Sequence, residues 1–202
     1  MSKRPFGTWW VSLAVLVLGV WAWAASTDKN EPRERAKPTG VIQAQDMADA
    51  LQMIIATDRA MYARHVVQRL EEAKITGAGD RGLEQNTLPS PCQLLRLSTV
   101  HIQTKGAEFH YSLRSLTPLE PRNAPETDAE KTGLKFVSEH PDQNYYGRET
   151  LGGRRYFTAI YPDRAVVPSC VTCHNEHAAS RRKDFKPGDV LGALVIRVAL
   201  EF

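Results

Sequence analysis

This sequence of 202 residues has little excess of one charge over the other, no internal repeats and no recognisable catalytic motif. Lysine and arginine total 26 against 23 aspartates and glutamates, so the net charge is only +3, and the basic residues are scattered. The basic face by which proteins hold nucleic acid is therefore excluded. The lack of repeats and low-complexity tracts excludes a repeat architecture. With no P-loop and no Ser-His-Asp arrangement visible, neither nucleotide hydrolysis nor triad chemistry is indicated.

Cysteine is scarce as well, and two of the three cysteines lie in one short motif. Three cysteines allow at most one disulfide, which excludes a disulfide-framed domain. Cys170-Val171-Thr172-Cys173-His174 has the Cys-x-x-Cys-His spacing of c-type haem attachment. Both thiols can form thioethers with the haem vinyl groups, and the adjacent imidazole can take an axial position on the iron. The motif predicts one covalently bound haem c.

Two other readings of this motif remain open. A structural zinc site could use Cys170, Cys173, His174 and His177, but such sites usually take a second pair of ligands from distant sequence. A redox-active dithiol is typical of a βαβ context, which the surrounding sequence does not show.

A single long apolar run lies at the N-terminus. Lys3 and Arg4 precede residues 9–25, which carry no charge, and Ala22-x-Ala24 resembles a signal-peptidase site. The run is also close to the roughly 20 residues that span a bilayer. We therefore expect residues 1–26 to be a signal peptide or a membrane anchor, with both alternatives open, and residues 27–40 to be a linker. The remaining domain, 41–202, is expected in the periplasm, either soluble or anchored to the inner membrane by residues 9–25.

The rest of the chain predicts an α+β fold. Apolar residues at helical spacing predict a long helix over residues 41–75, and Ser90 before Pro91 predicts a second helix to about residue 105. A strand over 107–116 and a helix over 126–139 follow, and then a hairpin of 145–151 and 155–161 around Gly152-Gly153. We expect the haem motif on a loop and an apolar strand over 189–200 in the sheet centre. Helices followed by an antiparallel sheet are typical of α+β folds.

The order of these motifs resembles a family of PAS-like haem-c-binding sensor domains, long catalogued as a domain of unknown function. The resemblance covers roughly residues 41–200. The matching stretches are Thr57-Asp58-Arg59, Tyr62, Val66-Val67, Tyr111-Ser112-Leu113, Arg122-Asn123, Tyr145-Tyr146-Gly147, Gly152 to Phe157, Tyr161-Pro162-Asp163, Cys170 to His177 and Gly188-Asp189-Val190. It implies a PAS-like antiparallel sheet packed against the long N-terminal helix, with haem c held between them in a secreted or membrane-anchored protein.

The second axial ligand of the haem iron has three candidates, which we rank in the order His65, Cys92 and Met61. His65 and Met61 lie on the apolar stripe of the long helix, which we expect to face the haem or the sheet through Met47, Leu51 and Ile54. Cys92 could supply a thiolate, as the resemblance implies for some family members. Each also has a plain structural reading, as a core histidine, a packing methionine or a small buried residue.

The leading hypothesis is an extracytoplasmic mono-haem c protein that acts in redox or small-gas sensing or in electron transfer, without catalysis. It would require a redox or signalling partner protein, and for gas sensing a small gas ligand. The alternatives are a haem enzyme of the peroxidase or nitrogen-oxide reductase type, which needs an open iron site and a distal acid or base, and a structural zinc-binding domain.

Overall fold

The computed structural model describes residues 42–79 and 87–201. The expected signal or anchor segment, 1–26, and the linker, 27–40, lie outside the described residues. Among the residues that are described, no helix combines the length and apolar character needed to cross a membrane.

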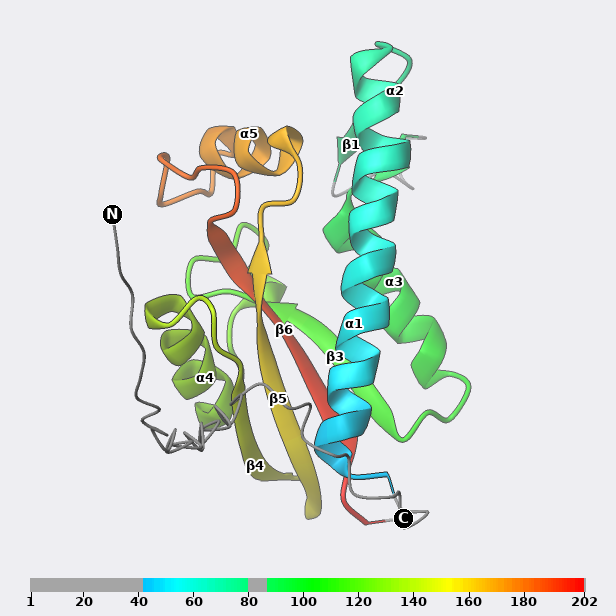
Figure 1. Cartoon of the computed structure of the whole chain (residues 1–202), viewed down its shortest axis with the longest axis vertical. Coiled ribbons are helices and arrows are strands. Elements are labelled where there is room, and N and C mark those ends of the chain that lie inside the picture. Colours follow the sequence, from blue (N-terminus) through cyan, green and yellow to red (C-terminus); the bar gives the residue numbers. More distant parts are fainter. Residues whose placement is uncertain (1–41, 80–86, 202) are drawn as a thin grey trace, which may run out of the picture. The chain divides into compact units, whose positions relative to one another are not determined.

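A four-stranded antiparallel sheet forms the centre of the fold, in the order β3-β6-β5-β4 (Figure 1). Its strands are β3 Phe109–Arg114, β4 Tyr145–Leu151, β5 Arg154–Arg164 and β6 Val190–Ala199. Strand β6 lies between β3 and β5 because its side chains are apolar on both faces: Leu194, Ile196 and Val198 face one side, and Ala193 and Val195 the other. The predicted central strand and the predicted hairpin are both confirmed.

Helices cover both faces of this sheet (Figure 1). The helical elements are α1 Ala44–Tyr62, the π-helical turn η1 Ala63–Val67, α2 Gln68–Glu72, α3 Pro91–Gln103, the 3-10 turn η2 Pro121–Asn123, α4 Asp128–Glu139 and α5 Pro168–Glu176. Helices α1 and α3 pack on the face of Leu194 and Ile196, whereas α4 packs on the opposite face. A short parallel pair, β1 Ala78–Gly79 and β2 Leu88–Pro89, precedes α3. The predicted α+β class is therefore confirmed.

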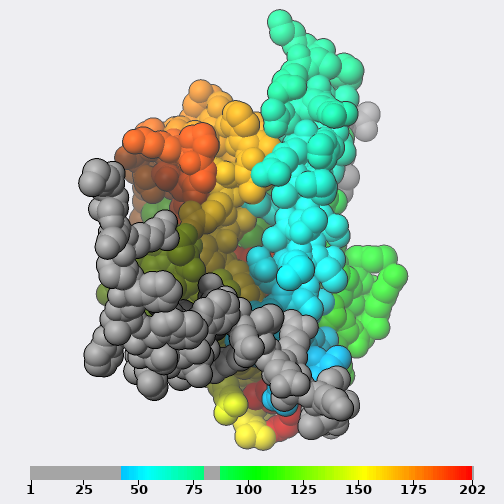
Figure 2. All heavy atoms as spheres, in the orientation of Figure 1, coloured from blue at the N-terminus to red at the C-terminus, as the bar shows by residue number. Residues whose placement is uncertain are grey.

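The long N-terminal helix is confirmed as an unbroken rod that contains one π-helical turn. Elements α1, η1 and α2 follow one another from residue 44 to residue 72. The second predicted helix is confirmed too, because the Ser90 side chain accepts a hydrogen bond from the Gln93 backbone N–H at 3.1 Å and Pro91 occupies the first helical position. In Figure 2 the upper part of the rod (cyan to blue-green) stands beside the region of α5 (orange).

The predicted orientation of this helix is wrong for three residues of the stripe. Met47 and Leu51 do pack against the core, but Ile54 and Met61 are 59% and 42% exposed, and His65 is exposed as well. The residues that the helix buries are Ala48, Ile55, Arg59, Ala63 and Val67.

The error has two physical causes. Arg59 occupies the middle of the buried face, where an apolar-periodicity argument does not expect a guanidinium. In addition, the π-helical turn Ala63–Val67 contains more residues than an α-helical turn, so it shifts residues from His65 onward relative to a 3.6-residue period, whereas Ile54 and Met61 precede it. The apolar stripe extrapolated from the sequence therefore points outward along this half of the rod.

Candidate functional site

The Cys-x-x-Cys-His motif lies on a helix and not, as the sequence led us to expect, on a loop. Helix α5 begins with Pro168 at its first turn, a favourable position because the missing N–H has no intrahelical partner there. It ends before His177, whose ψ of 136° leaves the helical region. At 100° per residue, Cys170, Cys173 and His174 share one side of α5. The helix therefore presents both thiols and the imidazole in the same direction.

That side of α5 borders a cavity at the end of the sheet. About 940 Å³ of space, part of it open to solvent, lies between α5, the α1–η1–α2 rod, the start of α3 and the ends of β3, β5 and β6. The cavity lining includes Cys170, Cys173 and His174 from α5, together with Arg59, Val67, Cys92, Leu113, Leu119, Asp163 and Leu191. The lining of the cavity thus combines apolar side chains with polar and charged ones.

Arg59 and Asp163 form an ion pair in the wall of this cavity. Nη2 of Arg59 donates a hydrogen bond of 2.9 Å to Oδ2 of Asp163, Nη1 lies 2.9 Å from Oδ1, and the side chains are only 5% and 16% exposed. Burial acts against the charge on Arg59, but Asp163, and to a lesser extent Cys92 and Cys170, hold its pKa above the ordinary value. The Nε atom of Arg59 is buried and has no hydrogen-bond partner in the part of the chain that the structure describes. The cavity wall thus contains a fixed cation beside two of the three cysteines.

The floor of the cavity depends on a glycine. A Cβ atom at Gly192 would lie 2.5 Å from the backbone oxygen of Arg114, closer than real Cβ contacts allow. Gly192 therefore lets β6 approach β3 closely where both strands border the cavity.

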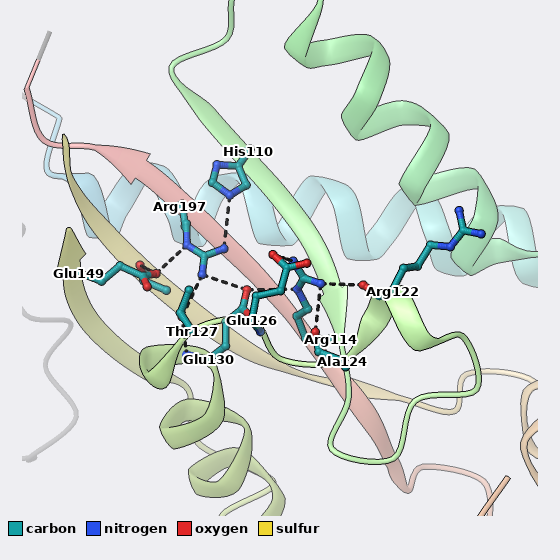
Figure 3. Close-up of polar contacts among 10 residues, drawn as sticks. His110, Arg114, Arg122, Ala124, Glu126, Thr127, Glu130, Glu149 and Arg197 are labelled. Atoms are coloured by element: carbon teal, nitrogen blue, oxygen red, sulfur yellow. Dashed lines mark hydrogen bonds and ion pairs between the residues drawn. The ribbon is translucent and has the colours of Figure 1, made fainter. Parts of the chain in front are cut away.

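A second wall is formed by the segment that follows β3, and Arg114 holds it (Figure 3). Its Nη1 donates to the backbone oxygens of Arg122 at 2.7 Å and Ala124 at 3.1 Å, while its Nε donates to Glu130 at 3.1 Å. Its Nη2 lies 2.8 Å from Glu126. These contacts fix the segment that carries Leu119 and Asn123 into the cavity lining.

The same polar network continues under helix α4, away from the cavity (Figure 3). Arg197 donates to Glu130 at 2.9 Å and to Glu149 at 2.6 Å, and its Nη1 lies 3.3 Å from His110 Nε2. Burial and the neighbouring Arg197 lower the pKa of His110. Burial works to raise the pKa of Glu149, but its hydrogen bonds from Arg197 and Thr158 lower it overall. The network therefore favours a neutral imidazole and a charged carboxylate.

The structure brings together four of the six residues that the sequence singled out. Cys170, Cys173, His174 and Cys92 all line the cavity. His65 and Met61 do not belong to the lining and are exposed on the outer side of the rod. Within the ranges 42–79 and 87–201, no group of three or more His, Cys, Asp or Glu side chains is gathered as a metal site would need, so the zinc reading has no ligand set there.

Sequence reasoning overlooked Arg59 and Asp163 as parts of the site. They are 104 positions apart, and neither stands in a motif with an assigned chemistry. One signal was present, because both residues lie in stretches on which the family resemblance rests, Thr57-Asp58-Arg59 and Tyr161-Pro162-Asp163.

Comparison with known proteins identifies the family. The sequence model of the Tll0287-like family matches residues 39–199. Among solved structures, the crystal structure of the cyanobacterial heme-protein Tll0287 is similar, with a TM-score of 0.49 and 13% sequence identity over 79% of this chain and 98% of that chain. No curated protein matches the sequence. Because the family model spans most of the sequence, including the helical rod, the sheet and the Cys-x-x-Cys-His helix, this chain belongs to the Tll0287-like family.

Proposed function

We propose that this protein carries one haem c, attached through thioethers to Cys170 and Cys173, with His174 as an axial ligand of the iron. The observation that carries the proposal is that both thiols and the imidazole line one cavity. Cys170 and His174 are half-buried and Cys173 is exposed, so the cofactor can reach all three. Tll0287, for which the family is named, is described as a heme-protein, which supports the same cofactor here.

The residues of the cavity fit this group. Val67, Leu113, Leu119 and Leu191 supply apolar cover, which limits the access of water to a bound haem. The buried Nε of Arg59 is a donor that has no hydrogen-bond partner among the described residues. When bound, the haem would supply a reversible one-electron change. The antiparallel sheet with its helical cover supports the PAS-like arrangement implied by the resemblance.

We further propose Cys92 as the second axial ligand, ahead of His65 and Met61. Cys92 lines the cavity from the start of α3, whereas α5 borders it from another side. The positive charge of Arg59 lies close to Cys92 and favours a negatively charged sulfur there. Ligation by Cys92 would occupy the position that a gas or a peroxide needs. This favours electron transfer or redox sensing over gas sensing or catalysis.

The test of this role is a redox titration of the mature protein, made with the c-type maturation machinery. We expect a low-spin spectrum, reversible one-electron reduction and no uptake of CO by the parent protein. A high-spin parent that binds CO readily would contradict the redox role and support the gas-sensing or enzymatic alternative.

We propose that the domain works outside the cytoplasm, where haem c is attached, delivered there by the apolar segment 9–25. A reporter that fluoresces only in the cytoplasm, fused after residue 202, is expected to stay dark. A bright fusion would contradict this location. The mass of the mature protein distinguishes cleavage after Ala24 from a retained anchor.

A further inference from the structure

A buried aromatic ring lies in the polar segment that follows the haem-attachment helix. Residues 178–189 are mostly exposed and charged, yet the Phe185 side chain is only 7% exposed. It packs with Ala165 and Leu191, and the partly buried Cys170 and Val171 of α5 lie against the same cluster. The segment is therefore folded back onto the helix that carries the motif.

The ring of Phe185 meets the imidazole of His174. The ring centroids are 5.5 Å apart and the ring planes are inclined by 84°, an edge-to-face arrangement. Aromatic pairs prefer this geometry because the positive edge of one ring faces the negative face of the other, and it adds roughly 0.5–1.5 kcal/mol beyond burial. Phe185 therefore restrains the rotation of the His174 ring.

Two side chains hold Phe185 in this position. Asn175, the residue after His174, donates from Nδ2 to the backbone oxygen of Phe185 at 3.0 Å and accepts from the Phe185 backbone N–H at 2.9 Å. The Arg182 guanidinium lies 4.3 Å from the centroid of the Phe185 ring. Arg182 is in turn held by Asp184 at 2.7 Å and Asp189 at 2.8 Å.

We propose that Phe185, fixed by Asn175 and Arg182, is a positioning residue for His174: it sets the orientation of the axial imidazole and keeps water from the side of the imidazole that it covers. The proposal rests on the proposed function, in which His174 binds the iron. Partners beyond the ligands fix ring orientation and, with the apolar surroundings, set the redox potential of a metal centre. Loss of the ring would admit water beside His174 and so change the balance between the ferric and ferrous forms. The midpoint potential would therefore shift.

The test compares Phe185→Leu with two matched variants of the mature holoprotein. Phe185→Tyr keeps an aromatic ring. Phe136→Leu removes a ring that stacks on His140 at 4.6 Å on helix α4, outside the cavity lining. The readouts are the midpoint potential, the EPR spectrum of the ferric form and the paramagnetic NMR shifts of the haem methyl groups, which depend on the plane of the axial imidazole.

We expect Phe185→Leu to keep covalent haem but to show a shifted potential and altered EPR and haem-methyl shifts. Phe185→Tyr is expected to restore the parent values, and Phe136→Leu to leave them unchanged. Parent values in Phe185→Leu, or the same change in Phe136→Leu, would overturn the proposal. If Phe185→Leu does not incorporate haem, Asn175→Ala takes its place: a shifted potential with altered EPR and haem-methyl shifts supports the proposal, and parent values overturn it. A parent protein without haem would instead contradict the proposed function.

Discussion

Arg59 is a cation at a position that is almost closed to solvent, and Asp163 is the reason it is tolerated there. A 2.9 Å hydrogen bond and a second N–O contact of 2.9 Å join the pair in the cavity wall. A buried pair of this kind adds little net stability compared with apolar residues of similar volume, but removal of one partner leaves the other buried and uncompensated.

We therefore predict that Arg59→Met lowers the free energy of unfolding by about 3–5 kcal/mol. The double variant Arg59→Met with Asp163→Leu is expected to recover much of this loss, since no charge is then left without its partner. Urea unfolding of the mature protein measures both. The control is Lys131→Met, which removes an exposed partner of Asp128 and is expected to cost less than about 1 kcal/mol. A double variant as unstable as the sum of both single variants would contradict this account.

The three candidates for the second haem ligand differ in whether they line the cavity. Cys92 lines it, and the other two side chains are exposed elsewhere on the rod. We predict that Cys92→Ser moves the ferric optical spectrum from low towards high spin and shifts the midpoint potential, since oxygen is a weaker ligand than sulfur. His65→Ala and Met61→Leu are expected to keep the parent spectrum. The prediction fails if Cys92→Ser is unchanged or if His65→Ala gives the high-spin spectrum.

Among the elements, helix α4 is tied to the sheet by charge as well as by apolar packing. Glu130, fully buried on α4, accepts hydrogen bonds from Arg114 on β3 and Arg197 on β6. Leu134 and Val137 of the same helix pack on Ile160 of β5. Helix α4 thus covers the face of the sheet that carries Ala193 and Val195. Its attachment depends on a network that also contains the titratable side chains His110 and Glu149.

We predict that the protein loses stability in two steps as the pH falls. The pKa of His110 is lowered in the fold, so below about 6.5, its usual value, the unfolded chain takes up a proton that the folded protein does not, and stability falls. The pKa of Glu149 is also lowered, so its contribution is complete above the unfolded value of about 4.3 and is lost as the pH falls through the folded value.

Urea midpoints measured from pH 8 to pH 3 test this prediction. His110→Gln is expected to flatten the decline in the upper step and Glu149→Gln the decline in the lower step. His140→Gln serves as the control, because His140 is exposed and lies outside the network. An unchanged upper step in His110→Gln would contradict the assignment.

The sequence predicted those helices and strands that are marked by residues adjacent in the chain, and it failed where a distant residue decides the structure. The Ser90 cap with Pro91, the Gly152-Gly153 turn and the two-sided apolar run of β6 are local signals, and the structure confirms them. The face of α1 could not be predicted, because burial of Arg59 depends on Asp163, which is distant in sequence. The motif helix α5 was missed because residues 168–176 have no apolar period, although Pro168 marked its start.

At the scale of the whole molecule, the cavity lies where the rod, the sheet and α5 meet, so its lining comes from segments far apart in the sequence. The Cys-x-x-Cys-His motif was visible because its residues are adjacent in the chain. The remaining walls, from Arg59 to Gly192, come together only through the fold. The central claim is that this meeting point holds a haem through two covalent bonds.

Haem staining of a denaturing gel tests that claim most directly, with the chain produced alongside the c-type maturation machinery. The parent protein and Cys92→Ala are expected to give a stained band at the mass of the protein, because thioethers survive denaturation and Cys92 takes no part in attachment. The variant with both Cys170→Ala and Cys173→Ala is expected to give none. An unstained parent band, or a stained band from the double variant, would contradict the claim.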